Sequence, residues 1–478
     1  MNVNPITRLD YPDPDVIRVE DTYYMVSTTM HFMPGCEILQ SFDLVHWEHV
    51  TYVYETLDHT DAQQLKSGQN IYGQGMWAAS LRYHEGRFCI CFVANDTRKT
   101  YLYTSEKIDG PWKKQLIEGF YHDGSLLFDE DGRNYIVYGN DEIWITELNE
   151  DLTAPKKDGL HRLLVSDHKN PELGYEGSHI QKINGYYYIF LVHSLRDRWM
   201  RTEACFYSDS LEGEFTGGDV LCDDRGYCGQ GVAQGGIVDT PDGKWYAMLF
   251  QDSGAVGRIP ILLPVTWKDH FPFFGQNGHV PEEIEVHSTR PGYIYQPLVG
   301  SDDFCNGLLP HWQFNHDPDP RYYHLDALQG TYTITTREVC TELTQAVNTL
   351  TQRMSYPSCA AEVTVDASAL KEGDVAGLCA LQSCYAAVGI TKHHGKYEVL
   401  MLDKKEDGIL DMTEGTVVES HQMDFRLEAD FCNMKDEARC YYRVNKGDWL
   451  PIGTVHKLYF KLDHFTGCRF GLFCYAAE

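Results

Sequence analysis

Basic residues are scarce in this chain. It holds 40 Lys and Arg against 70 Asp and Glu, which gives a formal net charge of −30 over 478 residues. A protein of that charge repels nucleic acid phosphates and anionic membrane surfaces, and no local basic cluster interrupts the pattern. We therefore expect neither a nucleic acid nor a membrane as partner.

Long apolar runs and metal-site cysteine pairs are also missing. No run of about 18 uncharged apolar residues could span a bilayer, and residues 1–15 lack a basic segment followed by an apolar one. The 15 cysteines are scattered without a CxxC pair of zinc-site spacing. We interpret them as reduced core thiols and predict a cytoplasmic protein.

One hairpin pattern occurs five times in the first part of the chain. Each copy reads as an apolar strand, a tight turn rich in Asp, Asn or Gly, and a second, aromatic strand. The copies begin at Val16, Ser80, Ser125, Ser178 and Gly236. A second hairpin pattern follows most copies, as in SFDLVHWE at 41–48. Four strands in each of five units predict an all-β, five-bladed β-propeller over residues 1–295.

One residue of each copy stands where its first strand begins. Counting back from the aromatic residue after each turn selects Asp13, Trp77, Asp123, Glu176 and Gln234. First strands line the central channel of a propeller, so we expect these residues to converge at one mouth of the channel. The prolines of YPDPD at 11–15 stiffen the backbone and would aim Asp13 into that pocket.

Three converging carboxylates permit two chemistries, the binding of a hard cation such as calcium and acid–base catalysis. Positions spread around a ring leave room for a substrate, which favours catalysis. Glycoside hydrolysis with inversion needs two carboxyl groups roughly 6.5 to 9.5 Å apart, so that a water fits between acid, sugar and base. A third carboxylate would raise the pKa of the general acid and keep it protonated.

The segments YPDPD, GMWAAS, HDGSLLFDEDG and YEGSH resemble signature segments of glycoside hydrolase family 43. That family of five-bladed propellers includes β-xylosidases and α-L-arabinofuranosidases, and the resemblance covers essentially the whole chain. It implies that Asp13 is the general base, that Asp123 tunes pKa and orients the site, and that Glu176 is the general acid. Inversion at the anomeric carbon follows from this arrangement.

The resemblance also implies substrate contacts. Trp77 would form a wall for the sugar ring, and Arg258 would donate hydrogen bonds to sugar hydroxyls. Gln234 stands where many family members carry a histidine that organises water or calcium, and an amide does not titrate as imidazole does. We expect no cofactor for the chemistry, and whether a structural calcium binds stays open.

Other residues near these segments carry a weaker prediction. We include His179, Met30 and Phe32 as candidate pocket residues, although packing explains His179 equally well and such residues after a strand more often belong to the core. Asp10 and Asp15 flank Asp13, and we expect them to be solvated or to stabilise turns.

From about residue 300 the pattern changes to short strands of period-two alternation, such as GTYTITT and AAEVTVDAS. This pattern indicates a β-sandwich over 300–478. The resemblance identifies it as the concanavalin-like sandwich of many family members. Its role stays open between capping the propeller and lending a loop to the rim of the pocket.

We therefore expect an inverting, exo-acting glycosidase that releases L-arabinofuranose or D-xylose, or both, from arabinoxylan-derived oligosaccharides. The alternatives are a strict β-1,4-xylosidase, an arabinan-cleaving endo-enzyme, and a carbohydrate-binding propeller without catalysis. Retention of all three carboxylates argues against the last. The preferred pentose and the oligomeric state are not readable from the sequence.

Overall fold

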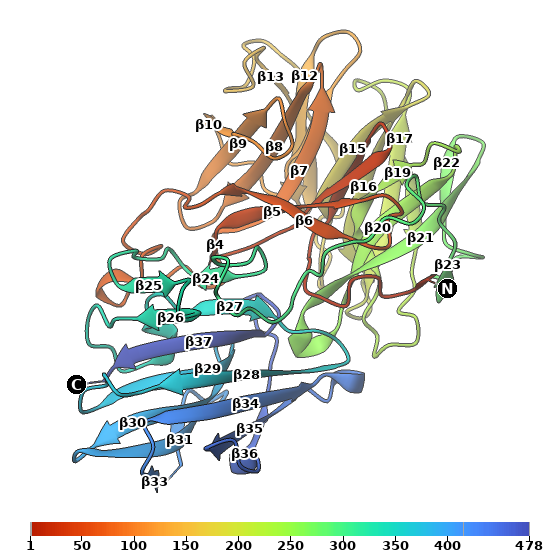
Figure 1. Cartoon of the computed structure of the whole chain (residues 1–478). Coiled ribbons are helices and arrows are strands. Elements are labelled where there is room, and N and C mark those ends of the chain that lie inside the picture. The colour runs from red at the N-terminus through yellow and green to blue at the C-terminus, as the bar shows by residue number, and fades with distance from the viewer. Residues whose placement is uncertain (1, 414, 478) are drawn as a thin grey trace.

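The protein is built almost entirely of β-strands, as its computed structural model shows for residues 2–413 and 415–477 (Figure 1). Within these ranges, no helix has the length and apolar character needed to cross a membrane.

Five four-stranded antiparallel sheets follow one another along the first part of the chain. In chain order their strands are β2 (Asp15–Val19), β3 (Thr22–Val26), β5 (Gly35–Ser41) and β6 (Glu48–Tyr54); β7 (Met76–His84), β8 (Arg87–Ala94), β9 (Lys99–Ser105) and β10 (Lys113–Ile117); β11 (Ser125–Phe128), β12 (Asn134–Asn140), β13 (Glu142–Leu148) and β14 (His161–Ser166); β15 (Glu176–Ile183), β16 (Tyr186–Ser194), β17 (Arg201–Ser208) and β18 (Thr216–Leu221); β19 (Ala233–Asp239), β20 (Trp245–Asp252), β21 (Arg258–Lys268) and β22 (Phe271–Phe274).

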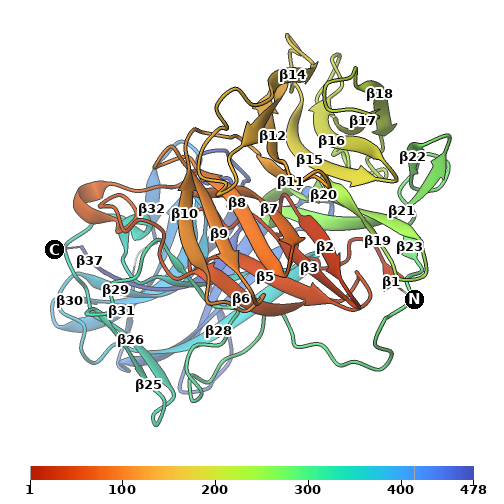
Figure 2. The same ribbon diagram turned by 90° about the horizontal axis from the view of Figure 1, so that it is seen from above.

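The first strands of these sheets form a closed ring. Strands β2, β7, β11, β15 and β19 each contact the next one, and β19 contacts β2. Each pair of neighbouring sheets buries its own apolar cluster; for example, Ile38 packs with Leu81 between the first two sheets, and Met25 packs with Val238 between the first and the last. The β-propeller predicted from the hairpin repeat is confirmed, and Figure 2 shows it from above.

The second part of the chain forms two packed sheets. The larger one has the order β32-β31-β30-β29-β37-β27-β24-β4, with β33 also paired to β31, and the smaller one has the order β28-β34-β35-β36. Their strands are β24 (Gln313–Asn315), β27 (Leu350–Arg353), β28 (Ser358–Asp366), β29 (Asp374–Leu381), β30 (Ala386–His393), β31 (Lys396–Lys404), β32 (Leu410–Met412), β33 (Thr416–Val418), β34 (Gln422–Asp430), β35 (Glu437–Val444), β36 (Leu450–Lys457) and β37 (Arg469–Ala476). Leu378 and Val388 of one sheet share a core with Phe425 of the other. The predicted β-sandwich is confirmed.

Strand β4 (Phe32–Met33) joins the two parts. It lies in a loop of the first blade but pairs antiparallel with β24 of the sandwich. Nearby, the buried Arg353 of the sandwich donates from Nη1 to Glu37 Oε2 of the propeller at 2.8 Å. Burial acts to raise the pKa of Glu37, but Arg353 and His49 outweigh it and lower that pKa to about 2. The propeller and the sandwich therefore share a buried ion pair. Removing the charge of Arg353 or of Glu37 would leave the other charge buried without this partner.

The cysteines are only partly as predicted. All 15 are free thiols, and eight of them are buried. Cys222, Cys228, Cys305 and Cys432 are exposed, so their interpretation as core residues was wrong. These four lie outside the β-strands, where side chains turn toward solvent.

Candidate active site

The first strands share a backbone irregularity at the mouth of the channel. The ladder shifts between Trp77 and Ser80 in β7, between Glu176 and His179 in β15, and between Ala233 and Gly236 in β19. One residue in each shifted stretch has a positive φ, and so has one residue just before β2 and one just before β11. These residues are Asp13, Ala78, Asp123, Gly177 and Gln234. Such bulges re-aim the side chains beside them.

This register corrects the predicted equivalence of five residues. Asp13, Asp123 and Gln234 share the position of positive φ, whereas Trp77 and Glu176 stand one residue earlier in their blades. The residues of that earlier position are Pro12, Trp77, His122, Glu176 and Ala233. Counting from the aromatic residue failed because that residue does not stand at the same distance along the ladder in every blade. Tyr24 pairs with the residue two positions after Asp15, whereas Phe88 pairs with the residue three positions after Ser80, the equivalent of Asp15.

Asp13 is held from two sides. Its Oδ2 accepts a hydrogen bond from Thr28 Oγ1 at 2.6 Å, and its Oδ1 lies 3.2 Å from the Arg258 Nη1 donor. Thr28 Oγ1 in turn accepts from the backbone N–H of Ala78 at 2.7 Å, which ties the first blade to the second. The carboxylate is 7% exposed, so its orientation is fixed by the protein rather than by solvent.

Asp123 and Glu176 both lie near the same nitrogen of one imidazole. His122 Nε2 is 3.6 Å from Asp123 Oδ2 and 3.6 Å from Glu176 Oε2. Asp123 Oδ2 also accepts the backbone N–H of Gly177 at 3.0 Å, and Glu176 Oε2 accepts from Asn140 Nδ2 at 2.8 Å. The structure therefore brings the three predicted carboxylates to one mouth of the channel.

The charges of this cluster are coupled. Burial raises the pKa of Asp123 to about 6; His122 opposes that rise, while Glu176 and Asp13 add to it. The carboxylate of Asp123, followed by Glu176 and Asp13, outweighs burial and raises the pKa of His122 to about 9. At neutral pH the imidazole therefore carries a proton.

Aromatic side chains from both parts of the molecule wall the pocket. The rings of Trp77 and Phe465 lie 5.4 Å apart between centroids, and Trp77 lies 6.1 Å from the ring of His122. The Arg258 guanidinium lies 4.3 Å from the centre of the Phe465 ring. Phe465 follows the last strand of the smaller sandwich sheet, so the sandwich reaches the pocket instead of only capping the propeller.

Two family models match this chain. The model of Glycosyl hydrolases family 43 matches residues 3–272, which is more than half of the chain, and a model named Beta xylosidase C-terminal Concanavalin A-like domain matches residues 301–478. The chain belongs to glycosyl hydrolase family 43.

Known proteins agree with this membership. A β-xylosidase from Formosa agariphila is 26% identical over 98% of this chain and 87% of its own length. A non-reducing end α-L-arabinofuranosidase from Bacteroides ovatus is 24% identical over 86% of this chain and 79% of its own length. A solved structure of a bifunctional GH43-CE protein from Bacteroides eggerthii has a TM-score of 0.93 at 41% identity and covers 100% of this chain. This chain spans 62% of the length of that protein. As a member of family 43, the chain described here is a glycoside hydrolase.

Three other predicted residues of this family 43 enzyme are buried. His179 is 7% exposed; its Nδ1 donates to the carbonyl of Gly177 at 3.0 Å, and burial lowers its pKa. Phe32 is 2% exposed and its ring lies 3.5 Å from the guanidinium of Arg469, so it contributes to the contact with the sandwich. Met30 is buried and pairs with Met76 through backbone hydrogen bonds. For these residues the structure shows packing roles.

Asp10 and Asp15 are not solvated, contrary to that part of the prediction. Asp10 is 6% exposed and accepts the backbone N–H groups of Arg258 and Gly467 at 2.7 and 2.8 Å. Asp15 is 1% exposed and pairs with Arg82 at 2.8 Å. Both side chains are buried, and a buried carboxylate needs such hydrogen-bond or ion-pair partners.

Sequence reasoning missed His122 and Phe465. The strand register places His122 at the same position as Trp77 and Glu176, so a count based on strand pairing would have found it. Phe465 comes from a distant loop of the sandwich and has a positive φ of 55°, and no local pattern assigns such a loop to a pocket.

The cluster could also be considered as a cation site. The ligand atoms of His122, Asp123 and Glu176 all lie within 4.8 Å of one another. With its proton, the His122 imidazolium has no lone pair to offer a metal and balances one of the two carboxylates, so an ion pair and a metal ligand are alternative states of this nitrogen.

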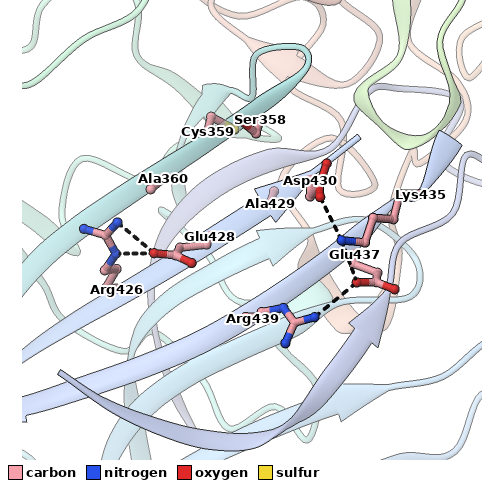
Figure 3. Close-up of a pocket in the computed structure, with 10 residues that line it drawn as sticks. All are labelled: Ser358, Cys359, Ala360, Arg426, Glu428, Ala429, Asp430, Lys435, Glu437 and Arg439. Carbon is pink, nitrogen blue, oxygen red and sulfur yellow. Dashed lines mark hydrogen bonds and ion pairs between the residues drawn. The ribbon is translucent and has the colours of Figure 1, made fainter. Parts of the chain in front are cut away.

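A groove lies elsewhere, on the sandwich sheet of β28, β34 and β35 (Figure 3). Its volume is about 510 Å³. The charged side chains drawn there neutralise one another: Arg426 pairs with Glu428, and Lys435 pairs with Asp430 and Glu437. In the propeller site the three carboxylates outnumber the two cations, Arg258 and His122, and we place the chemistry of this family 43 enzyme in the propeller.

Proposed function

We propose that this protein is an inverting, exo-acting glycosidase that releases terminal L-arabinofuranose or D-xylose from arabinoxylan-derived oligosaccharides. The observation that carries the proposal is the position of Phe465 of the sandwich, which packs against Trp77 and Arg258 beside the three carboxylates. A wall on this side suits a pocket for one terminal sugar better than a cleft open at both ends. The names of the relatives, β-xylosidase and α-L-arabinofuranosidase, fit both pentoses.

The three carboxylates divide the reaction between them. Asp13, oriented by Thr28 and neutralised by Arg258, would take a proton from a water that attacks the anomeric carbon. Glu176 would give its proton to the leaving glycosidic oxygen. Asp123 would stay ionised beside the acid and orient the site by accepting the backbone N–H of Gly177, the residue after the acid. The sugar is released with the opposite anomeric configuration.

Turnover of two chromogenic substrates tests this function. Wild-type protein should hydrolyse nitrophenyl α-L-arabinofuranoside, nitrophenyl β-D-xyloside or both at pH 6 to 7, and proton NMR should show the inverted anomer first. The Glu176→Ala variant should lose most activity on oligosaccharides but less on nitrophenyl substrates, whose leaving group needs little protonation. Folded wild-type protein that is inactive on both sugars would exclude the exo-pentosidase.

We further propose that the chemistry needs no cofactor. Treatment with EDTA followed by gel filtration should leave the turnover of the preferred pentoside within about twofold of the untreated enzyme, because the described acid and base groups act without a Lewis acid. Loss of activity that calcium restores would contradict this proposal and indicate a metal in the channel.

A further inference from the structure

The imidazole of His122 has no role in the reaction described so far. It occupies in the third blade the position that Glu176 occupies in the fourth and Trp77 in the second, so it faces the same mouth of the channel. Its Nε2 is buried, and among the described residues it has no hydrogen bond of good geometry. The same atom lies 3.6 Å from one oxygen of each neighbouring carboxylate.

The charges around His122 come from several elements. Its chain neighbour Asp123 and Glu176 of β15 both lie beside Nε2, and Asp13 of the first blade adds to the negative field. The second blade contributes the uncharged ring of Trp77, and the sandwich contributes the ring of Phe465, which lies beside Trp77. The other cation of the pocket, Arg258, is paired with Asp13.

The charge balance gives His122 a purpose. The proposed mechanism needs two ionised carboxylates, Asp13 and Asp123, in a site shielded from water, and each such charge is costly without a partner. Arg258 serves Asp13, and within the described residues His122 is the cation that forms an ion pair with Asp123. Burial favours the protonated form of Asp123, and a nearby positive charge counteracts that tendency.

We propose that His122 is a positioning residue whose imidazolium bridges Asp123 and Glu176, keeps Asp123 ionised, and thereby sets the lower pH limit of catalysis. The inference rests on the proposed function. His122 itself does not transfer the proton to the leaving group. No step of the proposed mechanism moves its proton, because neither reacting bond is assigned to it.

Two variants separate charge from shape. His122→Gln keeps a polar side chain of similar reach without charge, and His122→Lys keeps the positive charge. In His122→Gln, the acidic limb of the profile of kcat/KM against pH should move up by about one pH unit, which lowers activity at the acidic end about tenfold. In His122→Lys, the limb should return toward its wild-type position.

Several outcomes would overturn the inference. A uniform fall in kcat/KM without a shifted limb, in a variant whose melting temperature shows that it folds, would mean that His122 only packs against Trp77. A loss on oligosaccharides that largely disappears on nitrophenyl substrates would assign proton donation to His122 itself. A His122→Gln variant with wild-type activity and an unmoved acidic limb would overturn this inference alone. An inactive wild-type protein would overturn the proposed function together with it.

A second readout does not depend on activity. In histidine-labelled wild-type protein, with His122→Gln used to assign the signal, the imidazole resonance of His122 should stay at its protonated position from pH 5.5 to 8. The largest cause of its raised pKa is Asp123, so in Asp123→Asn the same resonance should titrate at lower pH. A resonance that titrates near pH 6.5 in the wild type would overturn the bridging ion pair.

Discussion

Arg258 shows how much one side chain contributes in this pocket. Its backbone N–H is held by Asp10, its Nη1 reaches Asp13, and its guanidinium stacks on Phe465. A lysine reproduces the charge but neither the planar stack nor the fork of donors. The residue therefore links the catalytic base to the wall supplied by the sandwich.

The Arg258→Lys variant should lower kcat/KM for the preferred pentoside by about 10- to 100-fold, because a shifted base loses alignment with its water. The measurement is steady-state kinetics with the preferred nitrophenyl pentoside. Arg290→Lys is the matched control, since Arg290 forms an exposed pair with Asp21 at the propeller surface and should leave the kinetics unchanged. Equal kinetics in both variants would remove Arg258 from the site.

At this scale the sequence predicted the chemistry but not its full surroundings. Asp13, Asp123 and Glu176 were found because acidic residues recur at the start of first strands, and the structure brings them together with Trp77 and Arg258. Their assigned roles stay predictions. His122 was missed because the aromatic residue used for counting stands one position further along the ladder in some blades than in others. That difference is set by the pairing between strands and is not visible in the sequence.

Among the elements, the segment after β36 of the sandwich has the largest expected effect on substrate binding. It carries Phe465 to the pocket and, two residues on, Gly467, whose N–H is bound by Asp10 of the propeller. A Cβ on Gly467 would lie 2.2 Å from the backbone oxygen of Val256, so the segment sits tightly against the last blade. The wall is therefore held in place by the propeller itself.

The Phe465→Ala variant should raise KM for nitrophenyl pentosides about tenfold with a smaller change in kcat, because an aromatic wall contributes to binding of the sugar in ground and transition state alike. Leu462→Ala is a control in the same segment, since Leu462 is 76% exposed. An unchanged KM in Phe465→Ala would show that the ring does not touch the sugar.

Strand prediction succeeded wherever a hairpin closed locally. The alternating patterns and turn residues of the blades correspond to observed strands, because each pairs with its neighbour in the chain. In the sandwich, the alternating segment that forms β28 pairs with β34, which lies far away in the chain, so the alternation alone marked that strand. Strand β4 was not foreseen as part of the sandwich, since its partner β24 lies nearly 300 residues away and the two segments share no local signal.

At the scale of the whole molecule, the contact between propeller and sandwich holds three buried histidines, His31, His316 and His464. The ring of His31 lies 4.9 Å from that of His316 and 5.8 Å from that of His464. Burial lowers the pKa of His31 and His316 well below the usual range and lowers that of His464 to about 4. The contact is thus built for neutral imidazoles.

Stability should therefore fall in acid. Between about pH 6.5 and 4 these histidines bind protons in the unfolded chain but stay neutral in the folded protein. The free energy of unfolding therefore decreases as pH falls, by about 1.4 kcal/mol per pH unit for each such group. The melting temperature should drop over this window. Among the described residues, neither ring nitrogen of His31 has a hydrogen-bond partner, and the ring lies 4.3 Å from that of Phe32.

The His31→Phe variant should accordingly melt at the same or a higher temperature at pH 7 and lose less stability at pH 5 than the wild type, because an apolar ring replaces an unsatisfied polar one. Replacing His287, which is 67% exposed, by Gln should leave the pH dependence unaltered. Identical pH dependence of melting in His31→Phe and wild type would show that His31 does not contribute to acid sensitivity.

Strand β4 has a consequence for exchanging modules between relatives. The loop that carries it runs from Thr28, a partner of the proposed base, to the edge of the larger sandwich sheet within a few residues. A chimaera that takes its sandwich from another family member would have to import the matching blade-one loop as well. Otherwise the foreign β24 would pair out of register with the native β4, and the resulting shift of the loop would displace the proposed base. The unit of recombination in this enzyme is therefore a sandwich together with one propeller loop.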